Sequence, residues 1–212
     1  MDKVLHYLYD PLCGWCYGAT PAVSKLLGIL GVTIELLPTG LFSGEGARPM
    51  DDAFAAYAWS NDQRIERLTG QRFTERYRHR ILGDHQQLFD SGPASVALTA
   101  VALTAPAREF EVLKAIQHAR YVDGSDITSL PTLVELLEGR GFKEAAAMVA
   151  HSDASLLNAH RARMSRAQAL MQEFGVRGVP TFIAEAGAKR WMLEPSAIYS
   201  TPHALISQLK AA

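Results

Sequence analysis

The sequence KVLHYLYDPLCGWCY at residues 3–17 carries the strongest structural signal in the chain. Its first part, Lys3 to Tyr9, is mostly apolar or aromatic and ends at Asp10-Pro11, which is typical of a buried strand. Apolar residues then recur at spacings of three and four, which predicts a helix from Cys13 to Leu30. Pro21 lies inside this helix and is expected to kink or interrupt it.

Further strands are predicted close to both ends of the chain. Val32 to Leu37 reads as a second strand, and a strand–helix–strand order favours parallel pairing with a right-handed crossover. Pro180 to Ala186 and Arg190 to Leu193 flank a turn, so we expect a hairpin. A last helix is predicted from Thr201 to Leu209, with threonine as its cap.

No convincing strand is found from Leu41 to Phe174, and this region is predicted to be helical. The helices expected there span 50–68, 73–82, 93–104, 108–121, 129–137, 142–149 and 153–174. Strands at both ends with helices between them predict an α/β sheet domain interrupted by an all-helical insertion. We place the sheet domain at residues 1–40 and 176–212 and the insertion at 41–175.

Composition excludes several classes of function. The 212 residues include 21 basic and 22 acidic side chains, and the net charge of −1 gives no general attraction to nucleic acids or anionic membranes. No apolar stretch approaches the ~20 residues needed to span a bilayer. The first residues lack the apolar core of a secretory signal, so we expect a cytoplasmic protein without nucleic-acid or membrane partners.

The chain contains two cysteines, Cys13 and Cys16, at the predicted start of a helix. With Cys13 at the N-cap, the amides of Trp15 and Cys16 are expected to point towards its sulfur. The positive end of the helix dipole favours the thiolate, which is the reactive form of cysteine. Cys13 is therefore the predicted nucleophile, and the less exposed Cys16 is the predicted resolving thiol.

The two residues between the cysteines tune this chemistry. Gly14 keeps the backbone approachable, and Trp15 offers an apolar surface without a titratable group, so we expect a less strongly oxidising pair than one with histidine there. Beside a strand–helix–strand pattern, a C-x-x-C pair is typical of a thioredoxin-like redox site. Two inert buried cysteines, or half of a zinc site, are the alternatives. No histidine pair has suitable spacing near the cysteines, so we expect no metal.

A second signal is GVRGVPTF at residues 175–182. Pro180 opens a predicted strand there, which any protein permits. A cis Val179–Pro180 bond is the functional interpretation, although only ~5–6% of X–Pro bonds are cis.

Taken together, YDPLCGWCY at 9–17 and GVPTF at 178–182 resemble the DsbA family of thioredoxin-fold thiol–disulfide oxidoreductases, and in particular its FrnE-like, predicted protein-disulfide isomerase branch. The segments LTGQRF at 68–73, FDSGP at 89–93 and VDGSDIT at 122–128 extend the resemblance to most of the chain. It implies a thioredoxin-like fold (β-α-β … β-β-α) with a large inserted helical domain.

The resemblance also implies roles for particular residues. Cys13 would be the nucleophile, Cys16 the resolving cysteine and Pro180 the cis-proline, with the backbone of Val179 pairing to an extended substrate. Gly14 and Trp15 would complete the substrate-binding surface. The motif departs from the Cys-Pro-His-Cys and Cys-Pro-Trp-Cys of relatives, which leaves the direction of electron flow open.

Two further residues near the motif have alternative interpretations. Asp10 is our candidate for the buried acid that assists proton transfer at the resolving thiol in thioredoxin-like proteins. A simple strand-ending Asp-Pro turn is the alternative for Asp10. His6, on the first strand, is expected to be a core histidine with satisfied hydrogen bonds.

The predicted function is thiol–disulfide exchange on protein or peptide thiols and disulfides, as an oxidase, reductase or isomerase. No diffusible cofactor is expected, because the Cys13–Cys16 pair carries the electrons, and either a thioredoxin-like protein or glutathione resets the pair. One alternative is a glutathione-dependent transferase or isomerase, of the kappa-class or 2-hydroxychromene-2-carboxylate isomerase type, which needs no resolving cysteine. Another is a thiol-binding, chaperone-like module.

Overall fold

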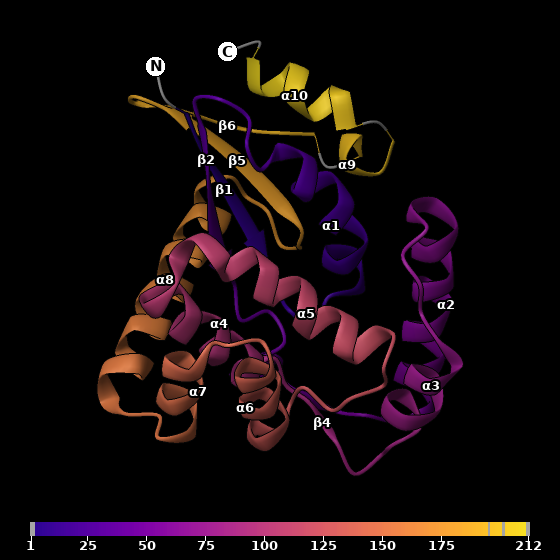
Figure 1. Ribbon diagram of the computed structural model, residues 1–212. Coiled ribbons are helices and arrows are strands. Elements are labelled where there is room, and N and C mark those ends of the chain that lie inside the picture. The colour runs from indigo at the N-terminus through magenta and orange to yellow at the C-terminus, as the bar shows by residue number, and fades with distance from the viewer. Residues whose placement is uncertain (1–2, 195, 201, 211–212) are drawn as a thin grey trace.

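A computed structural model describes residues 3–194, 196–200 and 202–210. Its main sheet has the order β2-β1-β5-β6, formed by β1 (Lys3–Tyr9), β2 (Val32–Pro38), β5 (Thr181–Ala186) and β6 (Lys189–Met192). Strand β1 runs parallel to β2 and antiparallel to β5, and β5 forms a hairpin with β6 (Figure 1). The predicted parallel pair and the predicted hairpin are both present, and they join the two ends of the chain.

The two faces of the sheet bury alternate residues, as the pleat of a strand requires. Tyr7 of β1 stacks on Phe182 of β5, with ring centroids 4.7 Å apart, and the Tyr7 hydroxyl donates to the Cys16 carbonyl of helix α1 (Gly14–Leu26), which covers this face. The neighbouring residues Leu8 and Ile183 pack against helix α8 (Ala154–Glu173) on the other face. The first strand is thus buried on both sides, which explains its almost continuous apolar sequence.

The segment between β2 and β5 is largely helical (Figure 1). It contains α2 (Asp52–Thr69), α3 (Glu75–Tyr77), η2 (Arg78–Leu82), α4 (Gly92–Thr104), α5 (Glu109–Tyr121), α6 (Leu130–Gly139), α7 (Lys143–Ala150) and α8, with 3-10 turns η1 (Gly44–Gly46) and η3 (Pro106–Arg108). Helices α4, α6 and α7 pack together at the end away from α10 (Pro202–Lys210), and α2 lies beside α1. The division of the chain at residues 40 and 175 stays a prediction.

The prediction of no strand in this segment was wrong. Strands β3 (Arg48–Pro49) and β4 (Leu88–Phe89) form a two-residue antiparallel pair. Neither strand is long enough to show the alternation of apolar and polar residues that marks a strand, so the sequence pattern does not predict them. The helix predicted from Phe73 to Leu82 begins instead at Glu75 and continues as π-helix from Arg78.

Helix α1 also differs from its prediction at its C-terminal end. It ends at Leu26 rather than Leu30, and Leu30 is fully exposed. Gly28 follows the helix with φ of +86°, a left-handed conformation that ends helices readily because glycine has no Cβ.

Helix α1 continues through Pro21, so the interruption that was one of the two predicted effects of this proline is absent. Its missing N–H would leave the carbonyl of Tyr17, four residues earlier, without a helical partner. That carbonyl accepts hydrogen bonds from Thr20 Oγ1 at 2.6 Å and Gln71 Nε2 at 3.3 Å. The side chains replace the lost backbone donor, so the helix continues.

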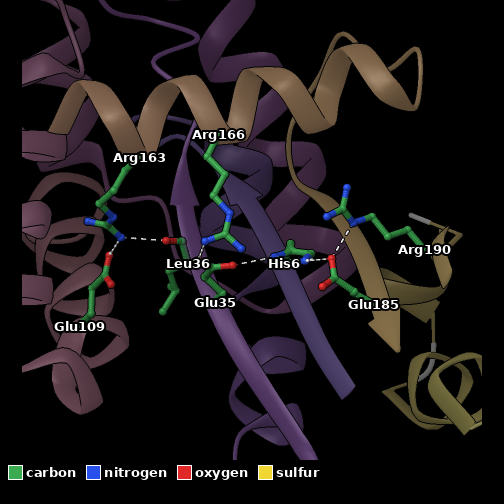
Figure 2. Close-up of polar contacts among 8 residues, drawn as sticks. All are labelled: His6, Glu35, Leu36, Glu109, Arg163, Arg166, Glu185 and Arg190. Carbon is green, nitrogen blue, oxygen red and sulfur yellow. Dashed lines mark hydrogen bonds and ion pairs between the residues drawn. The ribbon is translucent and has the colours of Figure 1, made fainter. Parts of the chain in front are cut away.

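His6 is buried on β1 with both ring nitrogens partnered, as predicted (Figure 2). Its Nδ1 lies 2.7 Å from Glu35 and its Nε2 lies 3.3 Å from Glu185. Glu35 also pairs with Arg166 of α8, and Glu185 with Arg190 of β6. The histidine therefore links three adjacent strands of the sheet, β2, β1 and β5, and serves a structural role there.

The chain ends in two helices, α9 (Ala197–Ser200) and α10. The sequence predicted α10 but missed α9, which is a single turn. The predicted cap of α10, Thr201, lies outside the described residues. Within the described ranges, no helix is long and apolar enough to cross a membrane.

Candidate active site

Cys13 is the N-cap of α1, as predicted. Its backbone is extended, and its sulfur accepts a hydrogen bond from the Cys16 amide at 3.3 Å. In the described part of the chain, the Trp15 amide makes no such bond, so one amide rather than two contacts the sulfur. The positive end of the helix dipole also lies at this position.

Cys16 lies one turn further along α1 and is completely buried, while Cys13 is 6% exposed. Burial raises the pKa of the Cys16 thiol well above its usual value, and the neighbouring Cys13 raises that pKa further. A hydrogen bond from the backbone of Asp10 opposes this shift. Both cysteines are free thiols in this structure. The geometry thus places a slightly exposed cysteine in front of a completely buried one that keeps its proton.

The fold brings the second sequence signal to Cys13. The Val179–Pro180 peptide bond is cis, and the Cys13 thiol donates to the Val179 carbonyl at 3.5 Å. Thr181 Oγ1 donates to the Gly178 carbonyl at 2.8 Å and closes the turn before β5. Segments 166 residues apart in sequence therefore meet at the predicted nucleophile.

Asp10 is fully buried directly beneath the cysteine loop. Its carboxylate accepts hydrogen bonds from the amides of Leu12 (2.9 Å) and Phe42 (3.1 Å) and from the Ser91 hydroxyl (2.7 Å). Burial nevertheless raises the pKa of Asp10 to about 6, while these three hydrogen bonds lower it. The carboxylate joins the cysteine loop, the segment after β2 and the start of α4, and its role in proton transfer stays a prediction.

Trp15 is held from both sides. Tyr199 of α9 donates to the Trp15 carbonyl at 2.9 Å, and its ring packs edge-on against the indole at 5.2 Å. The Arg64 guanidinium lies 5.6 Å from the indole centroid. The side chain remains partly exposed beside Cys13, where it is available to a substrate.

A pocket of about 210 Å³ opens beside Cys13. It is lined by Leu12, Cys13, Gly14, Trp15, Phe42, Phe54, Tyr57, Ala58, Asn61, Asp62, Ile65, Tyr77 and Phe89. Its wall is mainly apolar and includes six aromatic side chains, and helix α2 supplies about half of the lining residues. A pocket of this composition suits the apolar part of a thiol compound or peptide.

Sequence reasoning missed Asp62, the buried carboxyl group of this pocket. Asp62 is 4% exposed, and its pKa is raised to about 7 by burial. It lies four residues after Ala58 and three before Ile65, so helical spacing places it on the same face as these two apolar residues. An acidic residue on such a face is the signal that would have found it.

Among the described residues, no group of three or more His, Cys, Asp or Glu side chains is placed to hold a metal ion.

The sequence profile of the DSBA-like thioredoxin domain matches residues 4–196. The chain belongs to this family. The match confirms the predicted resemblance and the predicted thioredoxin-like fold.

Solved structures agree with this assignment. The cytosolic disulfide reductase DsbM from Pseudomonas aeruginosa is 33% identical, with a TM-score of 0.87, and the match covers 99% of this chain and all of DsbM. The same reductase solved with GSH is similar at 32% identity and a TM-score of 0.83, over 98% of each chain. A 2-hydroxychromene-2-carboxylate isomerase, at 17% identity, a TM-score of 0.61 and 98% of each chain, shares the fold. No curated protein matches.

The family and these neighbours support an enzyme with thiol–disulfide oxidoreductase activity, as the sequence predicted.

Proposed function

We propose that this protein is a glutathione-dependent disulfide reductase that works through Cys13 and Cys16. The observation that carries the proposal is the position of the Cys13 sulfur. It lies at a helix N-terminus, within 3.3 Å of the Cys16 amide and 3.5 Å of the Val179 carbonyl. The similarity to DsbM, a disulfide reductase whose structure was also solved with GSH, supports this direction and this thiol. DsbM is cytosolic, which supports a cytoplasmic location for this protein.

The reaction begins at Cys13. Its thiolate attacks one sulfur of a substrate disulfide R–S–S–R′, forming a Cys13–S–S–R mixed disulfide and releasing R′–S⁻, which takes up a proton. The helix N-terminus stabilises the attacking thiolate. An extended substrate would pair its backbone with Val179 beside the cis-proline, as in strand addition.

The second half of the reaction uses Cys16. Its thiol loses a proton and attacks the Cys13 sulfur, which releases R–SH and leaves a Cys13–Cys16 disulfide. Two glutathione molecules then reduce this disulfide and become glutathione disulfide. Because Cys16 is buried and its pKa is raised, it stays protonated until the mixed disulfide places an electrophilic sulfur next to it.

Cysteine variants test the proposal. We expect Cys13→Ser to lower glutathione-dependent disulfide reduction by ~10³-fold or more, because no thiolate remains to attack. We expect Cys16→Ser to accumulate a mixed disulfide with glutathione on Cys13, because the resolving thiol is absent. Intact-mass measurement after exposure to glutathione disulfide detects the adduct, and the double serine variant is the control.

Two results would contradict the proposal. The first is a Cys13→Ser variant that still reduces disulfides. The second is full turnover of a glutathione conjugation or isomerisation by Cys16→Ser, which would favour the type of chemistry named for the isomerase neighbour. Suppression of aggregation by the double serine variant, without any redox activity, would favour a chaperone-like module.

A further inference from the structure

Helix α2 places an acidic side chain against the C-x-x-C motif. Asp62 Oδ2 accepts a hydrogen bond from the Tyr77 hydroxyl at 3.0 Å. Within the described residues, Asp62 Oδ1 has no hydrogen-bond partner. A Cβ atom at position 14 would lie only 2.6 Å from this oxygen. Asp62 and Cys13 line the same pocket, so the free oxygen borders the space that a disulfide attacked by Cys13 would occupy.

The groups around Asp62 are mostly buried. Arg120 is 1% exposed, two of its guanidinium nitrogens lack hydrogen-bond partners among the described residues, and its charge lowers the pKa of Asp62. Tyr77 lowers that pKa as well, through its hydrogen bond, and Tyr121 and Cys13 are the other titratable neighbours. Burial outweighs the lowering effects, so the carboxyl group holds its proton for a substantial fraction of the time near neutral pH.

On the basis of the proposed reductase function, we propose that Asp62 is the general acid that protonates the departing substrate thiolate. Cys13 S⁻ attacks R–S–S–R′, the S–S bond breaks, and R′–S⁻ takes the Asp62 proton. The products are the Cys13–S–S–R mixed disulfide, R′–SH and an Asp62 carboxylate. Solvent returns the proton to Asp62 before the next turnover, so charge and electrons balance.

The other buried acids and thiols are less suited to this step. Both Asp10 oxygens are engaged by three donors, and that carboxylate lies beneath the loop rather than in the pocket. The Cys16 proton is required later, when Cys16 itself attacks. Gly14 has no side chain to separate Asp62 from the cysteine loop, which accounts for glycine at this position of the motif.

The test compares two substrates in a Cys16→Ser background, so that only the first step is observed. A dialkyl disulfide such as bis(hydroxyethyl) disulfide releases a basic thiolate that needs a proton. A bis(nitrobenzoate) disulfide releases an acidic aromatic thiol that does not. Both reactions require the Cys13 thiolate, so the ratio of the two rates removes the ionisation of Cys13 from the measurement.

In the parent of this test, the Cys16→Ser variant with Asp62 intact, we expect the ratio of the dialkyl rate to the aromatic rate to fall as the pH rises through about 7, where Asp62 loses its proton. Asp62→Asn should lower the dialkyl rate by ~10–100-fold below that pH, change the aromatic rate by less than about 2-fold and make the ratio independent of pH. Asp52→Asn, with an exposed side chain at the start of α2, removes the same charge outside the pocket and should leave the ratio unchanged.

Tyr77→Phe gives a second test that does not require Asp62→Asn to fold. Losing the hydroxyl donor raises the pKa of Asp62, so the fall of the rate ratio should move to higher pH. A ratio that does not change with pH in the parent, or equal slowing of both substrates by Asp62→Asn, would overturn the role of Asp62. If the parent reacts with neither disulfide, the proposed reductase function itself fails.

Discussion

Burial and hydrogen bonds shift the pKa of the carboxyl group beneath the cysteine loop in opposite directions. Burial raises the pKa of Asp10 to about 6, and the bonds from Leu12, Phe42 and Ser91 limit the rise. The folded state therefore binds a proton more tightly than the unfolded state does. The resulting stability is fully present below the ordinary pKa of 3.8 and is lost as the pH rises through about 6. The raised pKa of Asp62 likewise contributes stability at low pH, and this contribution is lost as the pH rises through about 7.

Ser91→Ala tests the hydrogen bond on Asp10. The Ser91 hydroxyl donates at 2.7 Å, and such a bond contributes more to an ionised acceptor than to a neutral one. We expect the variant to lose about 2 kcal/mol of unfolding free energy near pH 8 and about 1 kcal/mol near pH 5. Urea denaturation at both pH values measures the difference.

Ser24→Ala is the control for this experiment. Ser24 donates to the uncharged carbonyl of Thr20, so its loss should have the same effect at both pH values. An equal cost of Ser91→Ala at both pH values would contradict the raised pKa of Asp10.

At the scale of elements, the approach of α1 to α2 depends on glycines one turn apart. A Cβ atom at Gly18 would lie 2.5 Å from Ile65 Cγ2, and one at Gly14 would lie 3.2 Å from Ile65 Cδ1. Ile65 is 1% exposed, so it has little room to move. The contact between the two helices also holds Asp62 next to the cysteine motif.

Gly18→Ala is therefore expected to destabilise the protein by about 1–3 kcal/mol, although alanine is the better helix former. Gly139→Ala in α6 is the matched control, because a Cβ atom there would meet nothing within 4 Å. The control should be neutral or stabilising by up to about 1 kcal/mol. Thermal unfolding of both variants checks this, and a stabilising Gly18→Ala would refute the close packing.

At the scale of the whole molecule, α8 connects the sheet to the helical region through arginines (Figure 2). Arg163 donates to the Leu36 carbonyl of β2 at 2.7 Å and pairs with Glu109 of α5. Its side chain is 17% exposed and that of Glu109 is 7% exposed, so the pair is mostly buried. Arg166 reaches Glu35 from the same helix but is 55% exposed.

Arg163→Met is expected to cost about 3–5 kcal/mol, because it leaves the buried Glu109 without its positive partner. Arg166→Met should cost less than about 1 kcal/mol, since solvent already screens its pair with Glu35. Chemical denaturation at neutral pH compares the two. Similar losses of unfolding free energy for both variants would show that the cost of removing the arginine does not depend on the burial of its ion pair.

Features within a few residues of each other were predictable from the sequence. The first strand, the cysteine at the helix N-cap and the closing hairpin depend on periodicity, capping and turns, which are local properties. The pair of two-residue strands and the end of α1 were not predictable. The strands are too short to show the two-residue alternation of a strand. Helix α1 ends at Leu26, just before the left-handed Gly28, rather than where its apolar pattern stops.

The sequence by itself determined the local setting of Cys13 and Cys16, because a strand followed by a helix start can be read from pattern, and that setting predicts a redox pair. The resemblance to the DsbA family added the cis-proline. Only the tertiary structure decided what surrounds the pair. The contact of Asp62 with Gly14 depends on how α2 folds back against α1, and such contacts between distant residues follow from packing rather than from local pattern.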